Sequence, residues 1–205
     1  MKKAILFFSA IAFILFTSQV SGQKIKVESG SFAGLKDVST VEVEYVYDNM
    51  KVGKQSEADY IQKKVSEYNS KEPGSGDRWL VAWENDRDAR FHPRFEEEFN
   101  KQMKSRKVNL KVDKYEDSKY TLIVKTTFTE PGFNIGITRM DASVDLEVYL
   151  VETDDPDNSI GMIRIMKSPG RTAMGYDFDT GLRIQEAYAK AGKELAYFLW
   201  KKVLK

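Results

Sequence analysis

The single histidine, His92, is the first residue to consider for hydrolytic chemistry. The chain contains no cysteine, so an imidazole-activated nucleophile would need His92 as its base. No G-x-S-x-G elbow presents a serine for this role, and His92 stands directly before Pro93, between Arg90 and Arg94. We therefore expect an exposed histidine at the start of a helix rather than a catalytic base.

Metal-binding patterns are equally sparse. One histidine and no cysteine exclude the common zinc ligand sets. Asp154, Asp155 and Asp157 supply the oxygen ligands that calcium prefers. An EF-hand loop counted from Asp155 would need Gly at the sixth place, which is Ile160, and Glu at the twelfth, which is Met166. We interpret the aspartates as a solvated hairpin turn and expect no metal site and no cofactor.

Two glycine-rich segments lack the spacing of nucleotide-binding loops. Residues 74–76 are not followed by the Gly-Lys-Ser/Thr of a phosphate loop, and residues 132–136 do not match the dinucleotide fingerprint. The second segment favours a hairpin with Phe133 either packed inward or exposed at its tip. The acidic run 96–98 is typical of a solvated helix face, although paired carboxylates for an enzyme remain an alternative.

Aromatic side chains are the clearest compositional sign of binding. Trp79 and Trp83 are four residues apart, and Trp200 closes an aromatic group near the C-terminus. Core packing is their ordinary role, whereas exposed Trp and Tyr mark interfaces. Residues 168–178 mix Arg, Met and Tyr with glycine, a composition typical of binding loops. The candidate interaction surface comprises Trp79, Trp83, Phe133, Arg171, Tyr176 and Trp200.

The first 22 residues predict export. Two lysines precede an apolar run over 4–16, and the small residues Val20 and Gly22 stand three and one places before Gln23. The run is too short for a membrane span of about 20 residues. We expect a signal peptide over 1–22, cleavage between Gly22 and Gln23, and a periplasmic or secreted protein. A lipobox cysteine is missing, so no membrane anchor is expected.

Composition narrows the class of partner. Cleavage would leave 183 residues with 30 Lys and Arg against 31 Asp and Glu, a balance that argues against nucleic acid. An exported chain without cysteine has no disulfides, which favours a bacterial envelope protein. The length suits one good-sized core. We expect an N-terminal extension over 23–40 and a single domain over 41–205.

Hydrophobic periodicity predicts an α+β fold. Alternating apolar residues predict strands over 41–47, 108–112, 120–129, 142–150 and 160–167. Helical spacing predicts one helix from Ser56 to about Asn69, one from Pro93, and a long one from Asp179 or Thr180 to Val203. Residues 71–76 predict a flexible loop. We expect a two-layer sandwich of three helices on a mainly antiparallel sheet of four or five strands.

These elements resemble the small N-terminal domain of TolB and related exported envelope proteins of Gram-negative bacteria. Asp117-Ser118-Lys119-Tyr120 is similar to the Asp-x-x-Tyr segment that opens the family's central strand. The last helix is similar to the family's Arg-x-x-x-Ala-x-x-x-Ala-x-x-x-Ala pattern at Arg183, Ala187, Ala191 and Leu195-Ala196. The chain lacks the TolB propeller and the lipid-bearing cysteine of the lipoprotein relatives. The resemblance implies an α/β fold and an envelope setting, with no catalytic residues.

Three functions remain open at this stage. The first is a non-enzymatic adaptor or assembly factor that acts through contacts with an envelope protein. The second is a binder of a small ligand, glycan or lipid that uses the aromatic residues and the 168–178 loop. The third is an enzyme that works through a pair of buried carboxylates.

Overall fold

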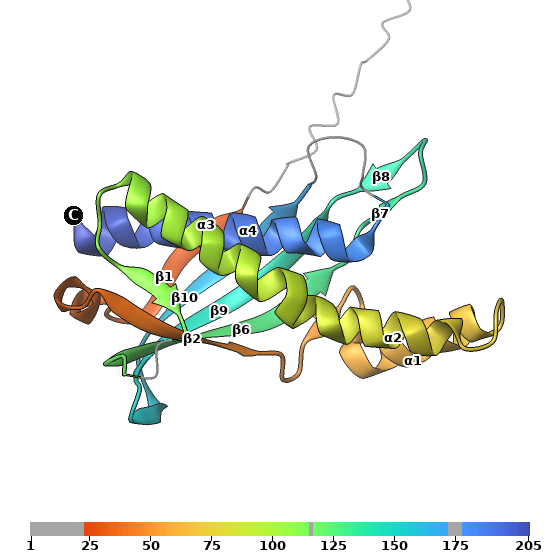
Figure 1. Ribbon diagram of the computed structural model, residues 1–205, viewed down its shortest axis with the longest axis horizontal. Helices are drawn as coiled ribbons and strands as arrows, with labels where there is room; N and C mark the ends of the chain where they lie inside the picture. Colours follow the sequence, from red (N-terminus) through yellow and green to blue (C-terminus); the bar gives the residue numbers. More distant parts are fainter. Residues whose placement is uncertain (1–22, 115–116, 172–177) are drawn as a thin grey trace, which may run out of the picture.

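The computed structural model describes residues 23–114, 117–171 and 178–205. Helices and strands both contribute, and the C-terminal helix is the longest, so the α+β class and the long last helix are confirmed. Figure 1 shows helices lying along one face of a sheet. The predicted signal peptide over 1–22 and Tyr176 of the candidate surface lie outside the described residues.

The sheet has eight strands, and six of them follow one another in a single hydrogen-bonded path. That path is β1 (Lys24–Gly30), β10 (Asp155–Gly170), β9 (Ala142–Glu152), β6 (Tyr120–Glu130), β2 (Thr40–Val46) and β5 (Lys111–Asp113). Two short strands, β3 (Lys51–Val52) and β4 (Gln55–Ser56), pair with each other, and β3 also pairs with β6. A separate hairpin is formed by β7 (Phe133–Asn134) and β8 (Arg139–Met140).

The expected sheet of four or five mainly antiparallel strands is wrong in its detail. β2 runs parallel to both β5 and β6, and β3 runs parallel to β6, so the sheet is mixed. Parallel strands require a long crossover, here three helices between β2 and β6, and such pairing leaves no local trace in the sequence. β1, from the predicted N-terminal extension, pairs antiparallel with β10 and lies at the edge of the sheet.

Two helix starts confirm the predicted caps. α1 (Glu57–Asn69) begins after Ser56, whose Oγ accepts a hydrogen bond from the Asp59 N–H at 3.1 Å. α4 (Thr180–Leu199) begins after Asp179, whose carboxylate accepts from the Leu182 N–H at 3.1 Å. In both cases the side chain satisfies an N–H group that the first helical turn leaves unpaired.

The middle helices differ from the expectation. α3 (His92–Ser105) carries Pro93 in its first turn as predicted, but α2 (Ser75–Asp86) precedes it and runs into it through a π turn (Arg87–Phe91). Proline lacks an N–H and clashes with the carbonyl four residues earlier in a regular helix, and a π turn relieves both problems. Ser75 and Gly76 belong to α2, which shortens the predicted flexible loop over 71–76.

The core lies between the sheet and the helices α3 and α4. On β9 the alternate residues Val144, Leu146, Val148 and Leu150 are fully buried, as their spacing predicts. α3 contributes three residues at four-residue intervals, Phe95, Phe99 and Met103, all of them buried.

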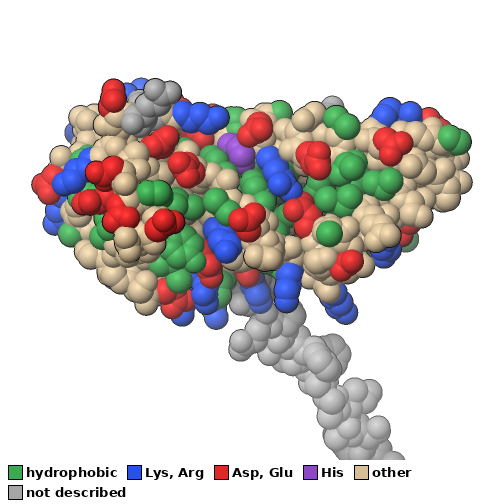
Figure 2. Space-filling model, turned by 90° about the horizontal axis from the view of Figure 1, so that it is seen from below, with side chains coloured by type: hydrophobic (Ala, Val, Ile, Leu, Met, Phe, Trp, Pro, Cys, Tyr) green, Lys and Arg blue, Asp and Glu red, His purple; other side chains and the backbone are tan. Residues whose placement is uncertain are grey.

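The opposite face of the sheet carries charged side chains among apolar ones. Arg164 pairs with Glu147 at 2.9 Å and with Glu28 at 3.4 Å, linking three neighbouring strands. Figure 2, which views the molecule from below, shows acidic, basic and hydrophobic side chains intermixed on this side. Such interspersed charges keep an open sheet face solvated.

α3 and α4 run parallel and in close contact. Near their N-terminal ends Arg94 lies 3.6 Å from Glu186, and near their C-terminal ends the Arg106 guanidinium lies 4.4 Å from the centre of the Trp200 ring. Between these points Gly192 meets the backbone of Phe95: a Cβ at 192 would stand 2.2 Å from the Phe95 carbonyl oxygen. Only glycine allows this approach.

We expect Gly192→Ala to destabilise the protein by roughly 1–3 kcal/mol, because the added methyl group forces α3 away from α4. In an open helix the same change would stabilise by about 1 kcal/mol. The measurement is urea unfolding, with Lys193→Ala, an exposed neighbour on the same helix, as the control. A Gly192→Ala protein as stable as the parent would contradict the close contact.

Candidate functional site

His92 is mostly buried and takes part in a side-chain network. Its Nδ1 is 3.0 Å from the Asp88 carboxylate and its Nε2 is 2.8 Å from the Tyr47 hydroxyl. The imidazole stacks on Tyr45 with ring centres 3.8 Å apart, and only 14% of the side chain is exposed. The expectation of an exposed histidine is therefore wrong, because a continuous helix turns this residue onto β2.

The network extends across four elements. The hydroxyl of Tyr47 also hydrogen-bonds Tyr188 of α4, and Tyr188 lies 2.6 Å from the Thr126 hydroxyl of β6. The Arg87 guanidinium covers the Tyr47 ring at 4.0 Å from its centre. Beside it, the Tyr45 hydroxyl donates to the Glu96 carboxylate at 3.1 Å. These contacts attach the start of α3 to the sheet and to α4.

Asp88, His92 and Tyr47 follow the order carboxylate, imidazole, hydroxyl that activates a nucleophile in hydrolases. The electrostatics here oppose activation of the Tyr47 hydroxyl. Burial raises the pKa of Tyr47 well above its usual 10, so its hydroxyl stays protonated. Burial also lowers the pKa of His92 to about 4, against the opposing effect of Asp88. Both imidazole nitrogens and the Tyr47 hydroxyl already have partners. The arrangement favours a structural role.

Trp79 and Trp83 come together between α1 and α2. Their rings are 5.6 Å apart, and Tyr60 of α1 lies 5.3 Å from Trp83. Trp83 is 8% exposed, and its indole N–H donates to the Glu57 carboxylate at 2.7 Å. These two tryptophans hold the α1–α2 hairpin together, and Figure 1 shows that hairpin extending at one end of the molecule.

Trp200 lies at the other end of the molecule, where α4 finishes. It is half-buried, packs beside Tyr197 with ring centres 5.6 Å apart, and is covered by Arg106. The six candidate residues therefore do not form one surface: Trp79 and Trp83 share one cluster, and Trp200 belongs to another.

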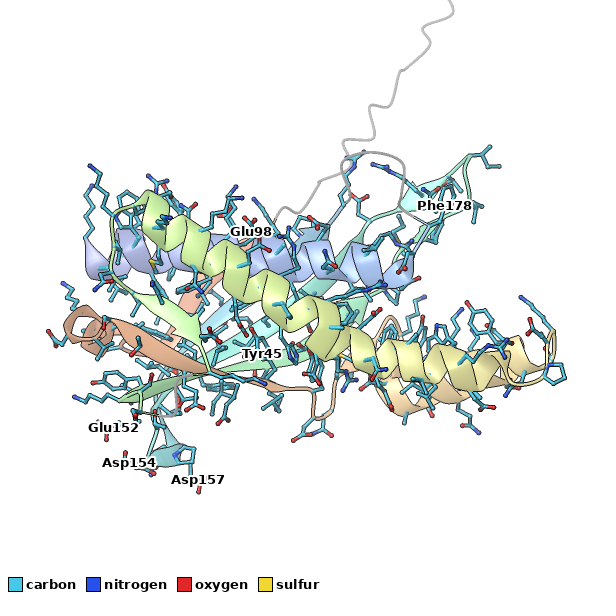
Figure 3. All side chains as sticks on the ribbon, in the orientation of Figure 1. Tyr45, Glu98, Glu152, Asp154, Asp157 and Phe178 are labelled. Carbon is cyan, nitrogen blue, oxygen red and sulfur yellow. The ribbon has the colours of Figure 1, made fainter. Side chains whose placement is uncertain are left out.

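The β7–β8 hairpin carries the main gathering of exposed apolar side chains. The Ile135 N–H donates to the Thr138 carbonyl at 3.1 Å, which closes the turn, and Gly136 takes a left-handed conformation there with φ of 86°. Ile137 is 96% exposed and Ile135 64%. We call the following set the apolar finger: Phe133, Ile135, Ile137, Met140 and Phe178. Figure 3 places Phe178 at the end of the molecule that carries the hairpin.

A buried arginine secures the root of the apolar finger. Arg183 of α4, 3% exposed, donates from Nε to the Pro131 carbonyl at 3.2 Å and from a terminal nitrogen to the Gly132 carbonyl at 3.3 Å. Gly132 has φ of 63°, and a Cβ there would stand 2.3 Å from the Met140 carbonyl. The hairpin therefore leaves the sheet from a fixed point.

Arg171 lies near this root. Its Nε is 4.0 Å from the Asp141 carboxylate, which is also 3.9 Å from Arg139. A cavity of about 530 Å³ opens beside Asp141 and is lined in part by Phe128, Met140 and Pro169. Phe133 and Arg171 are thus the two candidate residues that the fold brings to one region.

Sequence reasoning found Phe133 but missed the other members of the apolar finger. The available signal was the uncharged stretch 131–138, in which Ile135 and Ile137 flank a glycine in place of the polar residues usual in a turn. Phe178 could not be found this way, because only the attachment of α4 through Arg183 brings it to the hairpin end.

The acidic turn does not assemble a metal site in the part of the chain that the structure describes. There, no group of three or more His, Asp or Glu side chains is arranged to hold an ion. Asp155 instead accepts from the Asn158 amide at 2.8 Å, and Asp154 and Asp157 lie at a projecting tip (Figure 3).

Among residues 23–114, 117–171 and 178–205, no helix is long and apolar enough to cross a membrane.

His92 predicts a specific pH dependence of stability. Its pKa is about 4 when folded and 6.5 when exposed, so its contribution is present above about pH 6.5 and is lost as the pH falls towards 4. Between about pH 7 and pH 5 the free energy of unfolding should fall by about 1 kcal/mol through this group, because solvent around the exposed Asp88 screens part of the effect.

The measurement is urea unfolding of the parent and of His92→Phe across that range. The variant lacks the imidazole, so its free energy of unfolding should change less with pH, whatever its absolute stability. Identical pH dependence in the two proteins would show that His92 is not held neutral by the fold.

Comparison with known proteins found no matching family model and no matching curated protein. Among solved structures, the chain is similar to the crystal structure of protein XCC0632 from Xanthomonas campestris, described by the family model DUF330. The sequences are 10% identical, the match covers 78% of this chain and 82% of that one, and the TM-score is 0.33. A likeness of this degree carries no argument about function.

Proposed function

We propose that the mature chain is an exported, non-enzymatic domain of the bacterial envelope that binds another protein through the apolar finger. It would serve as an adaptor or assembly factor. The observation that carries the proposal is the clustering of exposed apolar residues: five of the nine large hydrophobic side chains exposed among the described residues belong to the apolar finger. Exposed apolar groups gathered in one place mark binding surfaces, whereas scattered ones do not.

The shape of the apolar finger supports a partner with an apolar groove. A projecting hairpin can insert into a groove of the partner, whereas a flat patch can only lie against its surface. Because Arg183 holds the root of the hairpin in place, less conformational entropy is lost on binding. No charged residue occurs over 131–138, so the turn of the hairpin can insert without desolvating a charge.

Export and the envelope setting are supported by the sequence of residues 1–22 and by the resemblance to TolB-like domains. The absence of an enzymatic role is supported by the contacts of His92, because Asp88 and Tyr47 occupy both ring nitrogens. The near-neutral composition supports a partner other than nucleic acid.

A second candidate is the binding of a small ligand, glycan or lipid beside the apolar finger. The observation in its favour is the cavity of about 530 Å³ lined in part by Phe128, Met140 and Pro169, a size suited to small molecules. The predicted 168–178 loop is wrong at its start, because Pro169 lies in β10 and pairs with β9; residues 172–177 lie outside the described residues.

The two candidates are separated by photo-crosslinking in cells. A photoreactive amino acid in place of Ile137 should give a discrete adduct with one envelope protein, and the same residue in place of Val81 should not. Val81 is a fair control because it is 57% exposed on α2. Adding Ile135→Ser and Met140→Ser should weaken capture roughly tenfold, as expected for loss of central apolar contacts.

Equal yields of adduct from positions 81 and 137 would contradict the proposal that the apolar finger contacts the partner. A lipid or glycan adduct at position 137, without a protein adduct, would instead favour the second candidate.

A further inference from the structure

A second region of the molecule forms an open cavity of about 470 Å³ at the C-terminal end of α3, and Figure 1 shows that end of α3 far from the β7–β8 hairpin. The cavity lies where α3 ends and the chain turns towards β5. Four of its lining residues are lysines, and no acidic residue lines it: the set includes Lys101, Lys104, Lys107, Lys111, Val108 and Leu110.

The backbone around this cavity is held in place before any ligand arrives. The turn after α3 is closed by the Val108 N–H, which donates to the Met103 carbonyl at 3.1 Å. The Asn100 side chain then pairs with β5 like a neighbouring strand: its amide donates to the Val112 carbonyl at 2.8 Å and its oxygen accepts from the Val112 N–H at 2.9 Å. A preformed rim lowers the ordering cost of binding.

Most of the positive charge at this cavity has no acidic partner among the described residues. Residues 101–111 contain five Lys and Arg and no Asp or Glu. Lys101 pairs with Glu98 at 3.3 Å. In the described parts of the chain, Lys104, Lys107 and Lys111 make no ion pair within 4.0 Å. The C-terminal segment 201–205 adds three lysines, two of which lie over Tyr197 and Trp200.

Helix dipoles alone do not explain this charge. A helix C-terminus carries about half a negative charge and attracts cations, and the parallel helices α3 and α4 both end here. Two helix ends supply roughly one negative charge, whereas four lysines line the cavity and one of them, Lys101, pairs with Glu98. The excess is available to a bound anion.

We propose that this cavity binds an anionic amphiphile, a molecule with a carboxylate or phosphate head on an apolar chain. Val108, Leu110 and the methylene stems of the lysines give it an apolar floor, and the ammonium groups at the rim attract an oxyanion. Its volume lies in the range of small-molecule sites. This site is independent of the proposed protein contact, because it shares no residue with the apolar finger.

The test titrates the intact exported protein with dansyl-undecanoic acid and follows dansyl fluorescence. Saturable binding is expected, with lysophosphatidylglycerol displacing the probe, and neutral lysophosphatidylcholine and inorganic phosphate displacing it far less. Lys104→Ala with Lys107→Ala should weaken binding roughly tenfold. Asn109→Glu, which adds a carboxylate to the lining without removing a lysine, should weaken it as well.

The matched control is Lys63→Ala with Lys71→Ala, which removes the same charge from exposed positions outside the cavity. Thermal unfolding of every variant shows whether the fold is kept. No saturable binding, equal loss in the control, or equal displacement by the neutral lipid would overturn the proposal. Binding to anionic vesicles without binding of the monomeric probe would also overturn it, since that result requires a surface and no cavity.

Discussion

The close parallel contact of α3 and α4 is the constraint on which the rest of the structure depends. Gly192 lets the two helices approach to the distance of a backbone contact, and together they cover the buried face of the sheet. Because the two helices run in the same direction, their N-terminal ends point towards one end of the molecule and their C-terminal ends towards the other. The start of α4 anchors the apolar finger through Arg183, and the end of α3 borders the lysine-lined cavity.

The His92 network fixes the same elements through polar contacts, in addition to the close packing of α3 against α4. It joins β2, α3, α4 and β6 through side chains rather than through backbone pairing. A satisfied buried network specifies one arrangement of the elements, since any shift would leave polar groups without partners. The π turn before Pro93 contributes by directing His92 onto Tyr45 within an otherwise continuous helix.

Local features of the fold were predictable because local physics determines them. Ser56 and Asp179 cap helices as their positions indicate, and Phe95, Phe99 and Met103 follow helical spacing. The parallel pairing of β2 with β6 was not predictable, because the partners are separated by three helices. α2 was missed because its apolar face is short and its N-cap is Gly74 in a left-handed conformation, which supplies no capping side chain. Of the candidate site, Phe133 could be found from the sequence, but the cavity combines lysines with a turn that only the fold defines.

The uneven distribution of charge gives the molecule a preferred orientation. Apart from the eight cations of 101–111 and 201–205, the chain after residue 22 holds 22 Lys and Arg against 31 Asp and Glu. The charge is also uneven within one end of the long axis: the lysines of the cavity lie there, and the tip that carries Asp154 and Asp157 projects at the same end (Figure 3). A negatively charged surface attracts the lysines and repels the acidic tip, so it favours orientations in which the cavity faces the surface and the tip faces away from it.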